Sequence, residues 1–154
     1  MFITDDHVNA LRAMLSGEMD EAEELIEIIG HSDYFWHFNV VIASAFALAV
    51  YRRFGQGYSV PGVIRFIADE RARQDDSADD FDPRVAEQLV LSVFTSEPVH
   101  GLDDEAKADI QIALLLGMIE DENLDDAELD LFIDDVRKTA EAAMPEVEQL
   151  LRRD

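Results

Sequence analysis

The sequence predicts an all-α protein that folds as a compact bundle of six or seven helices. Apolar residues recur with the 3.6-residue period of amphipathic helices, and capping residues, glycines and prolines divide the chain into segments of helical length. Two segments, about 34–54 and 103–120, are apolar on nearly all sides. Because such helices belong in a core, we expect these two to be central, to touch each other, and to be surrounded by the amphipathic ones.

Two short helices are expected at the N-terminus. Thr4 can cap the first and Ser16-Gly17 can end it, while Asp20 and Gly30 are suited to begin and end the second. The apolar stripe of the first helix consists of Val8, Leu11 and Leu15, and the apolar members of the second are Ala22, Leu25, Ile26 and Ile29.

The next helix carries no charged residue from Tyr34 to Tyr51. A membrane-spanning helix needs about 20 predominantly apolar residues. This run contains His37, Asn39 and Ser44 and is rich in alanine rather than leucine. We therefore expect a buried core helix and no membrane span.

The middle of the chain should hold a fourth helix, an acidic loop and a fifth helix. Ser59-Val60-Pro61 begins the fourth, and the acidic residues of 75–82 predict a mobile loop. Asp82-Pro83 combines a cap with a proline suited to the first helical turn. Residues 89–94 are rich in β-branched and aromatic side chains, so a buried strand is the alternative there, but no partner strand is visible and a helix is favoured.

The last two helices follow Asp103 and the turn at 121–123. The seventh has an apolar stripe at spacings of three and four residues, and Pro145 is expected to break or kink its tail. The stripe consists of Leu129, Phe132, Ile133, Val136 and Ala140.

Length and charge limit the classes of function. A chain of 154 residues fits one domain, residues 1–154. Its formal net charge of −23, from 35 acidic and 12 basic residues, disfavours direct binding of nucleic acids or anionic membranes. Such acidity also suits a protein from a saline cytoplasm, without any acidic binding site. The N-terminus lacks the basic and apolar regions of a secretory signal, so a cytoplasmic location is expected.

No motif predicts a metal, a cofactor or a catalytic centre. There is no cysteine, and the one Glu-x-x-His spacing, Glu97 and His100, has a proline inside it. Asp121, Asn123 and Asp125 match the first ligand positions of a calcium loop, but the glycine and the final glutamate are missing. We expect no cofactor and no metal site, and we favour a protein that is not an enzyme.

Five arginines lie in the stretch 31–74, which alone has a net positive charge; they are Arg52, Arg53, Arg65, Arg71 and Arg73. We expect them to pair within the protein and to complement helix dipoles. An anion site is the alternative.

The favoured function is an interaction protein that binds a basic protein partner. Residues 103–135 hold thirteen acidic residues against Lys107 alone, and Asp126, Asp130 and Asp134 should form an outer line on the seventh helix. A nucleic-acid mimic that inhibits a DNA-binding protein is one alternative. The other is a small-ligand binder or enzyme with a pocket near Tyr34, Trp36, His37 and Tyr58, although His37 on this apolar helix is expected to be buried and structural.

Overall fold

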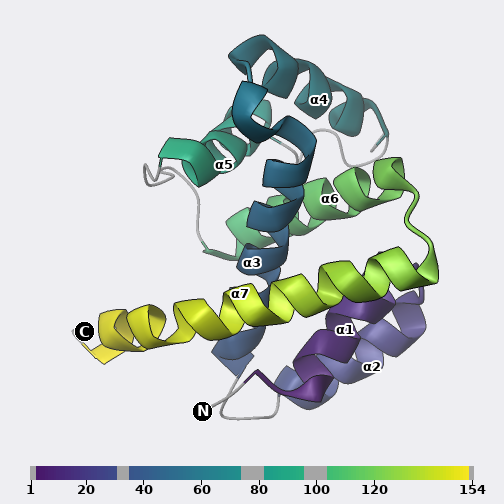
Figure 1. Cartoon of the computed structure of the whole chain (residues 1–154), viewed down its shortest axis with the longest axis vertical. Helices are drawn as coiled ribbons and strands as arrows, with labels where there is room; N and C mark the ends of the chain where they lie inside the picture. Colours follow the sequence, from purple (N-terminus) through teal and green to yellow (C-terminus); the bar gives the residue numbers. More distant parts are fainter. Residues whose placement is uncertain (1–2, 31–34, 74–81, 96–103, 153–154) are drawn as a thin grey trace. The chain divides into compact units, whose positions relative to one another are not determined.

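A computed structural model describes residues 3–30, 35–73, 82–95 and 104–152. Over these residues the chain forms seven α-helices and one short 3₁₀ helix, with no strand, which confirms the predicted all-α class (Figure 1). The elements are α1 (Asp5–Leu15), α2 (Met19–Gly30), α3 (Phe35–Phe54), η1 (Gly55–Gly57), α4 (Val60–Arg73), α5 (Pro83–Thr95), α6 (Asp104–Glu122) and α7 (Asp126–Arg152). Most of the loop predicted at 75–82 lies outside the described residues.

The chain divides into two compact units. Unit 1 consists of Met1–Ala45 and Glu122–Asp154, and unit 2 of Phe46–Asp121. Helix α3 therefore contributes its first half to unit 1 and its second half to unit 2. The single domain expected from chain length stays a prediction.

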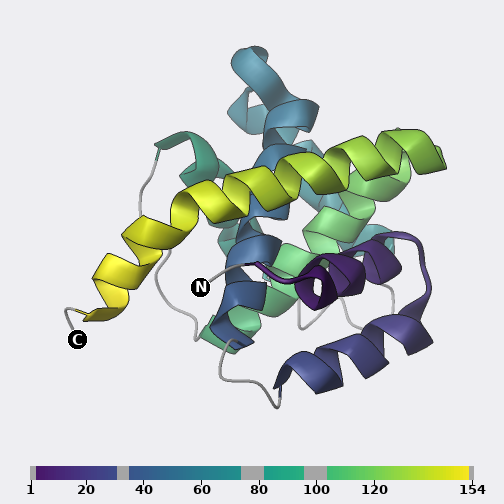
Figure 2. The same ribbon diagram turned by 60° about the horizontal axis from the view of Figure 1, so that its bottom comes forward.

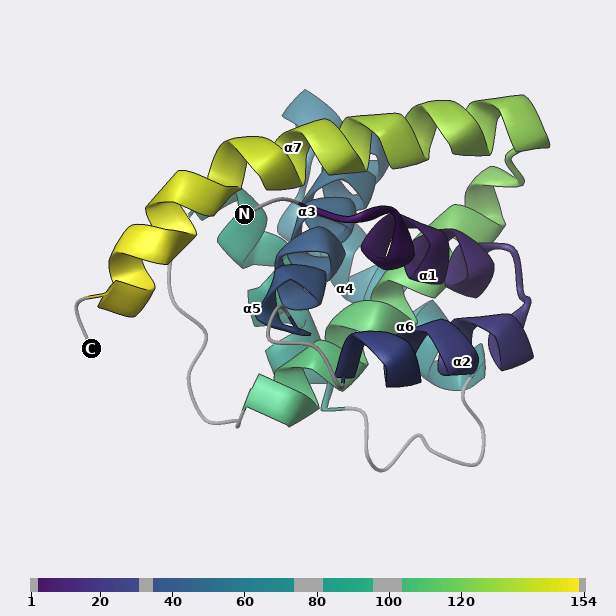
Figure 3. The same ribbon diagram turned by 90° about the horizontal axis from the view of Figure 1, so that it is seen from below.

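In unit 1, α1 and α2 form a helical hairpin (Figures 1 and 3). The turn between them is a Schellman motif: Gly17, with φ of 79°, donates from its N–H to the carbonyl of Met14, and the N–H of Glu18 donates to the carbonyl of Ala13. Glycine adopts this positive φ without the steric cost that a Cβ brings. The end predicted at Ser16-Gly17 is thus confirmed.

Helix α7 packs along α1 in unit 1. It begins with a reciprocal cap, in which the side chain of Asp125 accepts from the N–H of Glu128 (2.8 Å) and that of Glu128 accepts from the N–H of Asp125 (3.2 Å). The apolar stripe predicted for this helix is buried; its members are Leu129, Phe132, Ile133, Val136 and Ala140.

Pro145 was predicted to break or kink the tail of α7, and the break does not occur. The helix continues through Pro145 to Arg152, and Figure 2 shows its ribbon bending in the C-terminal part. A proline inside a helix removes one hydrogen bond and clashes with the carbonyl four residues earlier, which bends a helix that packing keeps intact.

In unit 2, α4 and α5 pack against each other. Helix α5 runs from Pro83 to Thr95, so residues 89–94 are helical and the strand alternative is excluded. Its buried side consists of Val85, Ala86, Leu89 and Val90. The expected contact between the two most apolar helices occurs at their C-terminal ends, where Arg53 of α3 pairs with Asp121 of α6. None of the described helices is long and apolar enough to cross a membrane.

Candidate functional site

The three acidic residues predicted to form an outer line on α7 are exposed, but they differ in whether they form an ion pair. Asp126, Asp130 and Asp134 are all exposed. Asp130 pairs with Arg12 of α1. Asp126 and Asp134 form no ion pair with the described residues. Since successive members of an i, i+4 series are about 40° apart around a helix with 3.6 residues per turn, the three carboxylates point in different directions, and Asp130, the middle one, reaches α1.

The edge of α7 that faces α1 is held by Arg137. Its guanidinium lies 2.8 Å from a carboxylate oxygen of Asp5 and donates to the carbonyl of Ile3 at 3.0 Å and to Glu141 at 3.2 Å. Hydrogen bonding to Asp5, then to Glu141, raises the pKa of Arg137. These groups join α7 to the N-terminal segment, so the carboxylates on this edge are already neutralised within the protein.

The outward side of α7 carries an isolated apolar side chain. Leu131 is 66% exposed. Its neighbours one turn away include Ala127, Asp134 and Asp135, all of them exposed. We call Ala127, Leu131, Asp134 and Asp135 the α7 outer face. This face combines the large apolar side chain of Leu131 with the carboxylates of Asp134 and Asp135.

The residues predicted to line a ligand pocket are distributed over both units. Tyr34 lies outside the described residues. Trp36 and His37 are in unit 1, with ring centroids 4.0 Å apart, and His37 is fully buried. Tyr58 is in unit 2, where its ring stacks on Phe94 at 4.2 Å.

His7 is a buried polar residue that sequence reasoning missed. Its Nδ1 accepts from the N–H of Thr4 (3.0 Å) and lies 2.8 Å from the Thr4 hydroxyl, so this histidine takes the role that glutamate usually has in a capping box. Its ring meets that of His37 edge-on at 5.9 Å. The available signal was the Thr4-x-x-His7 spacing.

Four charged side chains of unit 2 form a second feature, which we call the Glu70 cluster. Arg73 lies 2.9 Å from Glu70 and 2.6 Å from Asp121, and Arg53 lies 2.8 Å from the other oxygen of Asp121. The guanidinium of Arg53 also covers the ring of Phe66 at 4.7 Å. The intramolecular pairing predicted for the arginines is therefore found at Arg53 and Arg73.

Burial and pairing affect the two acids of the cluster in opposite directions. Glu70 is 3% exposed, and this burial raises the pKa of its carboxyl although Arg73 opposes the change. Hydrogen bonding from Arg73 lowers the pKa of Asp121. Two arginines balance the charges of two acids. We therefore interpret the cluster as a structural feature that links α3, α4 and α6.

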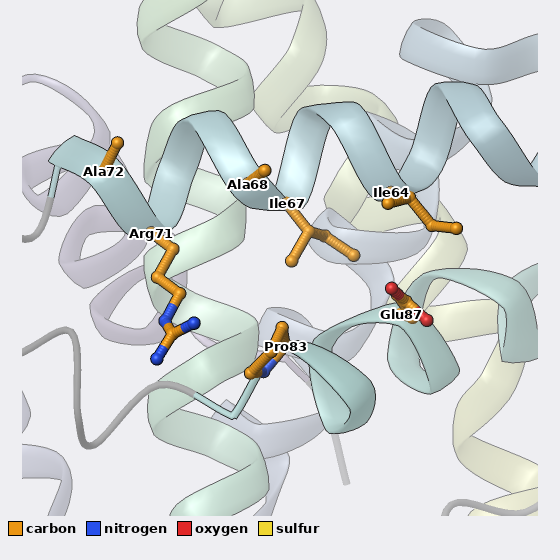
Figure 4. Close-up of a pocket in the computed structure, with 7 residues that line it drawn as sticks. All are labelled: Ile64, Ile67, Ala68, Arg71, Ala72, Pro83 and Glu87. Atoms are coloured by element: carbon orange, nitrogen blue, oxygen red, sulfur yellow. The ribbon is translucent and has the colours of Figure 1, made fainter.

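A cleft lies between α4 and α5 (Figure 4). Its volume is about 410 Å³, within the range of about 300–1,000 Å³ common for small-molecule sites. Ile64, Ile67, Ala68, Ala72 and Pro83 provide apolar walls, and Arg71 and Glu87 are its charged residues. No sequence pattern indicated this cleft, in which Ile67 is buried and Ile64 is 45% exposed.

In the part of the chain that the structure describes, no group of three or more histidine or acidic side chains could hold a metal ion. The three residues that resemble the start of a calcium loop have other roles. Asp121 pairs with two arginines, Asn123 has a positive φ of 51° in the turn, and Asp125 caps α7.

The fold and these sites define the chain as an all-α protein with an acidic helix face and an apolar cleft. Its sequence matches no protein-family model, and comparison with curated proteins and with solved structures finds no similar protein.

Proposed function

We propose that the protein is a non-enzymatic interaction protein that binds a basic protein partner through α7. The observation that carries this proposal is the 66% exposure of Leu131 among the carboxylates of the α7 outer face. At a protein interface an apolar contact contributes affinity, and complementary charges contribute orientation and a faster encounter.

Electrostatics favour a cationic partner for this face. Its two carboxylates, Asp134 and Asp135, lie on a chain of net charge −23 and form no ion pair with the described residues. A lysine- or arginine-rich partner would pair with these carboxylates, and the field of the whole chain would speed its approach.

The test is capture of proteins from the source lysate on the immobilised chain, at low salt, followed by elution with rising salt. Partners bound by charge should elute well above about 0.15 M, where the Debye length falls below about 8 Å. The triple variant Asp126→Asn, Asp130→Asn, Asp134→Asn should lose them. Because Asp130 also pairs with Arg12, a second variant, Asp126→Asn, Asp134→Asn, Asp135→Asn, removes three charges and keeps that ion pair.

The matched control changes three exposed acids of α2, as Glu23→Gln, Glu24→Gln, Glu27→Gln, which alters the net charge equally. It should retain the same partners. Leu131→Ser should weaken capture without changing charge. If both α7 variants keep the partners of the parent, or the α2 control loses them equally, this face is only a solvated surface and the proposal is wrong.

A further inference from the structure

We propose that the cleft between α4 and α5 is a binding site for a small aliphatic amine. The ammonium group would pair with Glu87, and the hydrocarbon part would lie against the exposed side chains of Ile64 and Ala68. This site belongs to unit 2 and is separate from the α7 outer face, so the inference does not depend on the proposed function.

The walls of the cleft explain why its occupant should be aliphatic. Ala68 and Ala72, four residues apart on α4, are too small to fill the space in front of them, and Pro83 adds an apolar ring from the first turn of α5. No aromatic side chain is among the lining residues. Flexible hydrocarbon suits such a surface better than a flat ring that would stack.

The two charged residues of the cleft have different positions. In Figure 4 the carboxylate of Glu87 lies below Ile64 and Ile67, whereas Arg71 extends beside Pro83. Arg71 already has an interaction partner within the protein. Glu87 is half-buried and forms no hydrogen bond or ion pair with the described residues.

The sign of the charge follows from these positions. A half-buried carboxylate next to apolar walls gains from a cation that also covers those walls, because the pair is less screened there than at the open surface. The net charge of −23 further attracts cations and repels anions. An alkyl ammonium ion meets both requirements, whereas a carboxylate or an uncharged alcohol meets only the apolar one.

The experiment is a titration of the full chain with n-butylamine, n-hexylamine and n-octylamine at neutral pH, followed by methyl NMR of Ile64, Ile67 and Ala68. At this pH the amines are protonated. Affinity should rise about fourfold for each methylene added until the cleft is full, from about 0.8 kcal/mol per buried methylene. Hexanol and hexanoate should bind more weakly than hexylamine.

Three variants and one control test the site. Glu87→Gln should weaken hexylamine binding about fivefold or more, while Asp69→Asn, the same charge change at an exposed site of α4, should not alter it. Ala68→Leu or Ala72→Leu should fill the cleft and block the amine; both positions are exposed, so the fold tolerates the larger side chain. Absence of hexylamine binding, equal binding by Glu87→Gln, equal binding of hexanoate, or affinity independent of chain length would each overturn the proposal.

Discussion

The carboxylate of Glu70 on α4 lies directly against Gly117 on α6. A Cβ at residue 117 would come within 2.6 Å of Oε1 of Glu70 and closer still to Oε2. Contacts below 3.0 Å force atoms to move. Glu70 is buried and paired with Arg73, so its carboxylate cannot swing into water without leaving the cluster.

Gly117→Ala should therefore lower the free energy of unfolding by about 1 kcal/mol. Overpacking of this kind costs about 1–3 kcal/mol, and the better helix propensity of alanine returns about 1 kcal/mol. Urea unfolding measures the change. In a Glu70→Ala background the clash is gone, and the same substitution should instead stabilise the chain by about 1 kcal/mol. If Gly117→Ala has the same effect in both backgrounds, the two side chains do not meet as described.

The contribution of Glu70 to the free energy of unfolding should increase as the pH falls. Burial raises the pKa of its carboxyl in the folded chain above the ordinary value of 4.5, so the folded state binds this proton more tightly than the unfolded state. The stabilising contribution of the neutral acid is present at low pH and is lost as the pH rises through the folded-state pKa. Asp121 acts oppositely, because its lowered pKa gives stability that is lost only as the pH falls below its ordinary 3.8.

The comparison that isolates Glu70 is wild type against Glu70→Gln between pH 4.5 and 7. The wild type should gain stability relative to the variant as the pH falls through this window. The glutamine keeps the size of the side chain and does not titrate. A difference that does not change with pH would contradict the assigned shift.

Arg137→Met should loosen the attachment of α7 to the N-terminal segment. The variant loses the contacts to Asp5 and to the carbonyl of Ile3, while methionine keeps much of the apolar stem. Because Arg137 is about one-third exposed, we expect a loss of only about 1 kcal/mol. Lys138→Met, at the exposed neighbouring position, should change the thermal midpoint much less. Equal effects would show that general charge, and not this contact, sets stability.

His37→Ala should destabilise the fold by about 1–3 kcal/mol. The ring is fully buried between Trp36 and His7, and its removal leaves a cavity and disturbs buried polar groups. Asn39→Ala, at an exposed position on the same helix, is the control for chemical denaturation. A stable His37→Ala variant with altered ligand binding would support the pocket alternative.

Pro145→Ala should stabilise α7, because it restores a backbone hydrogen bond and removes the proline ring from the helix interior. Proline costs about 3 kcal/mol relative to alanine in an ideal helix. Since the bend is already present and Pro145 is exposed, we expect a gain of about 1–2 kcal/mol, read from thermal unfolding by circular dichroism. A loss of stability would mean that the bend itself is needed for packing.

Local sequence patterns predicted the helices and the buried stripe of α7. Thr4 as a cap, Gly17 as a stop and Pro83 in the first turn of α5 act through hydrogen bonds and steric limits within a few residues, which are legible in a single segment. The stripe of α7 is legible for the same reason, because the 3.6-residue period places its members on one side.

Tertiary packing determines which polar groups are buried and which charges meet. Arg12 and Asp130 are 118 residues apart, and Asp5 and Arg137 are 132 apart, so no local pattern relates them. Glu70 stood on the apolar line of Val63 and Ile67, and Gly117 interrupted an apolar helix, but neither residue indicated the other. A proline bend, a buried carboxylate and an open cleft depend on how the surrounding helices fill space. Packing is a property of several segments at once, whereas capping and periodicity belong to one.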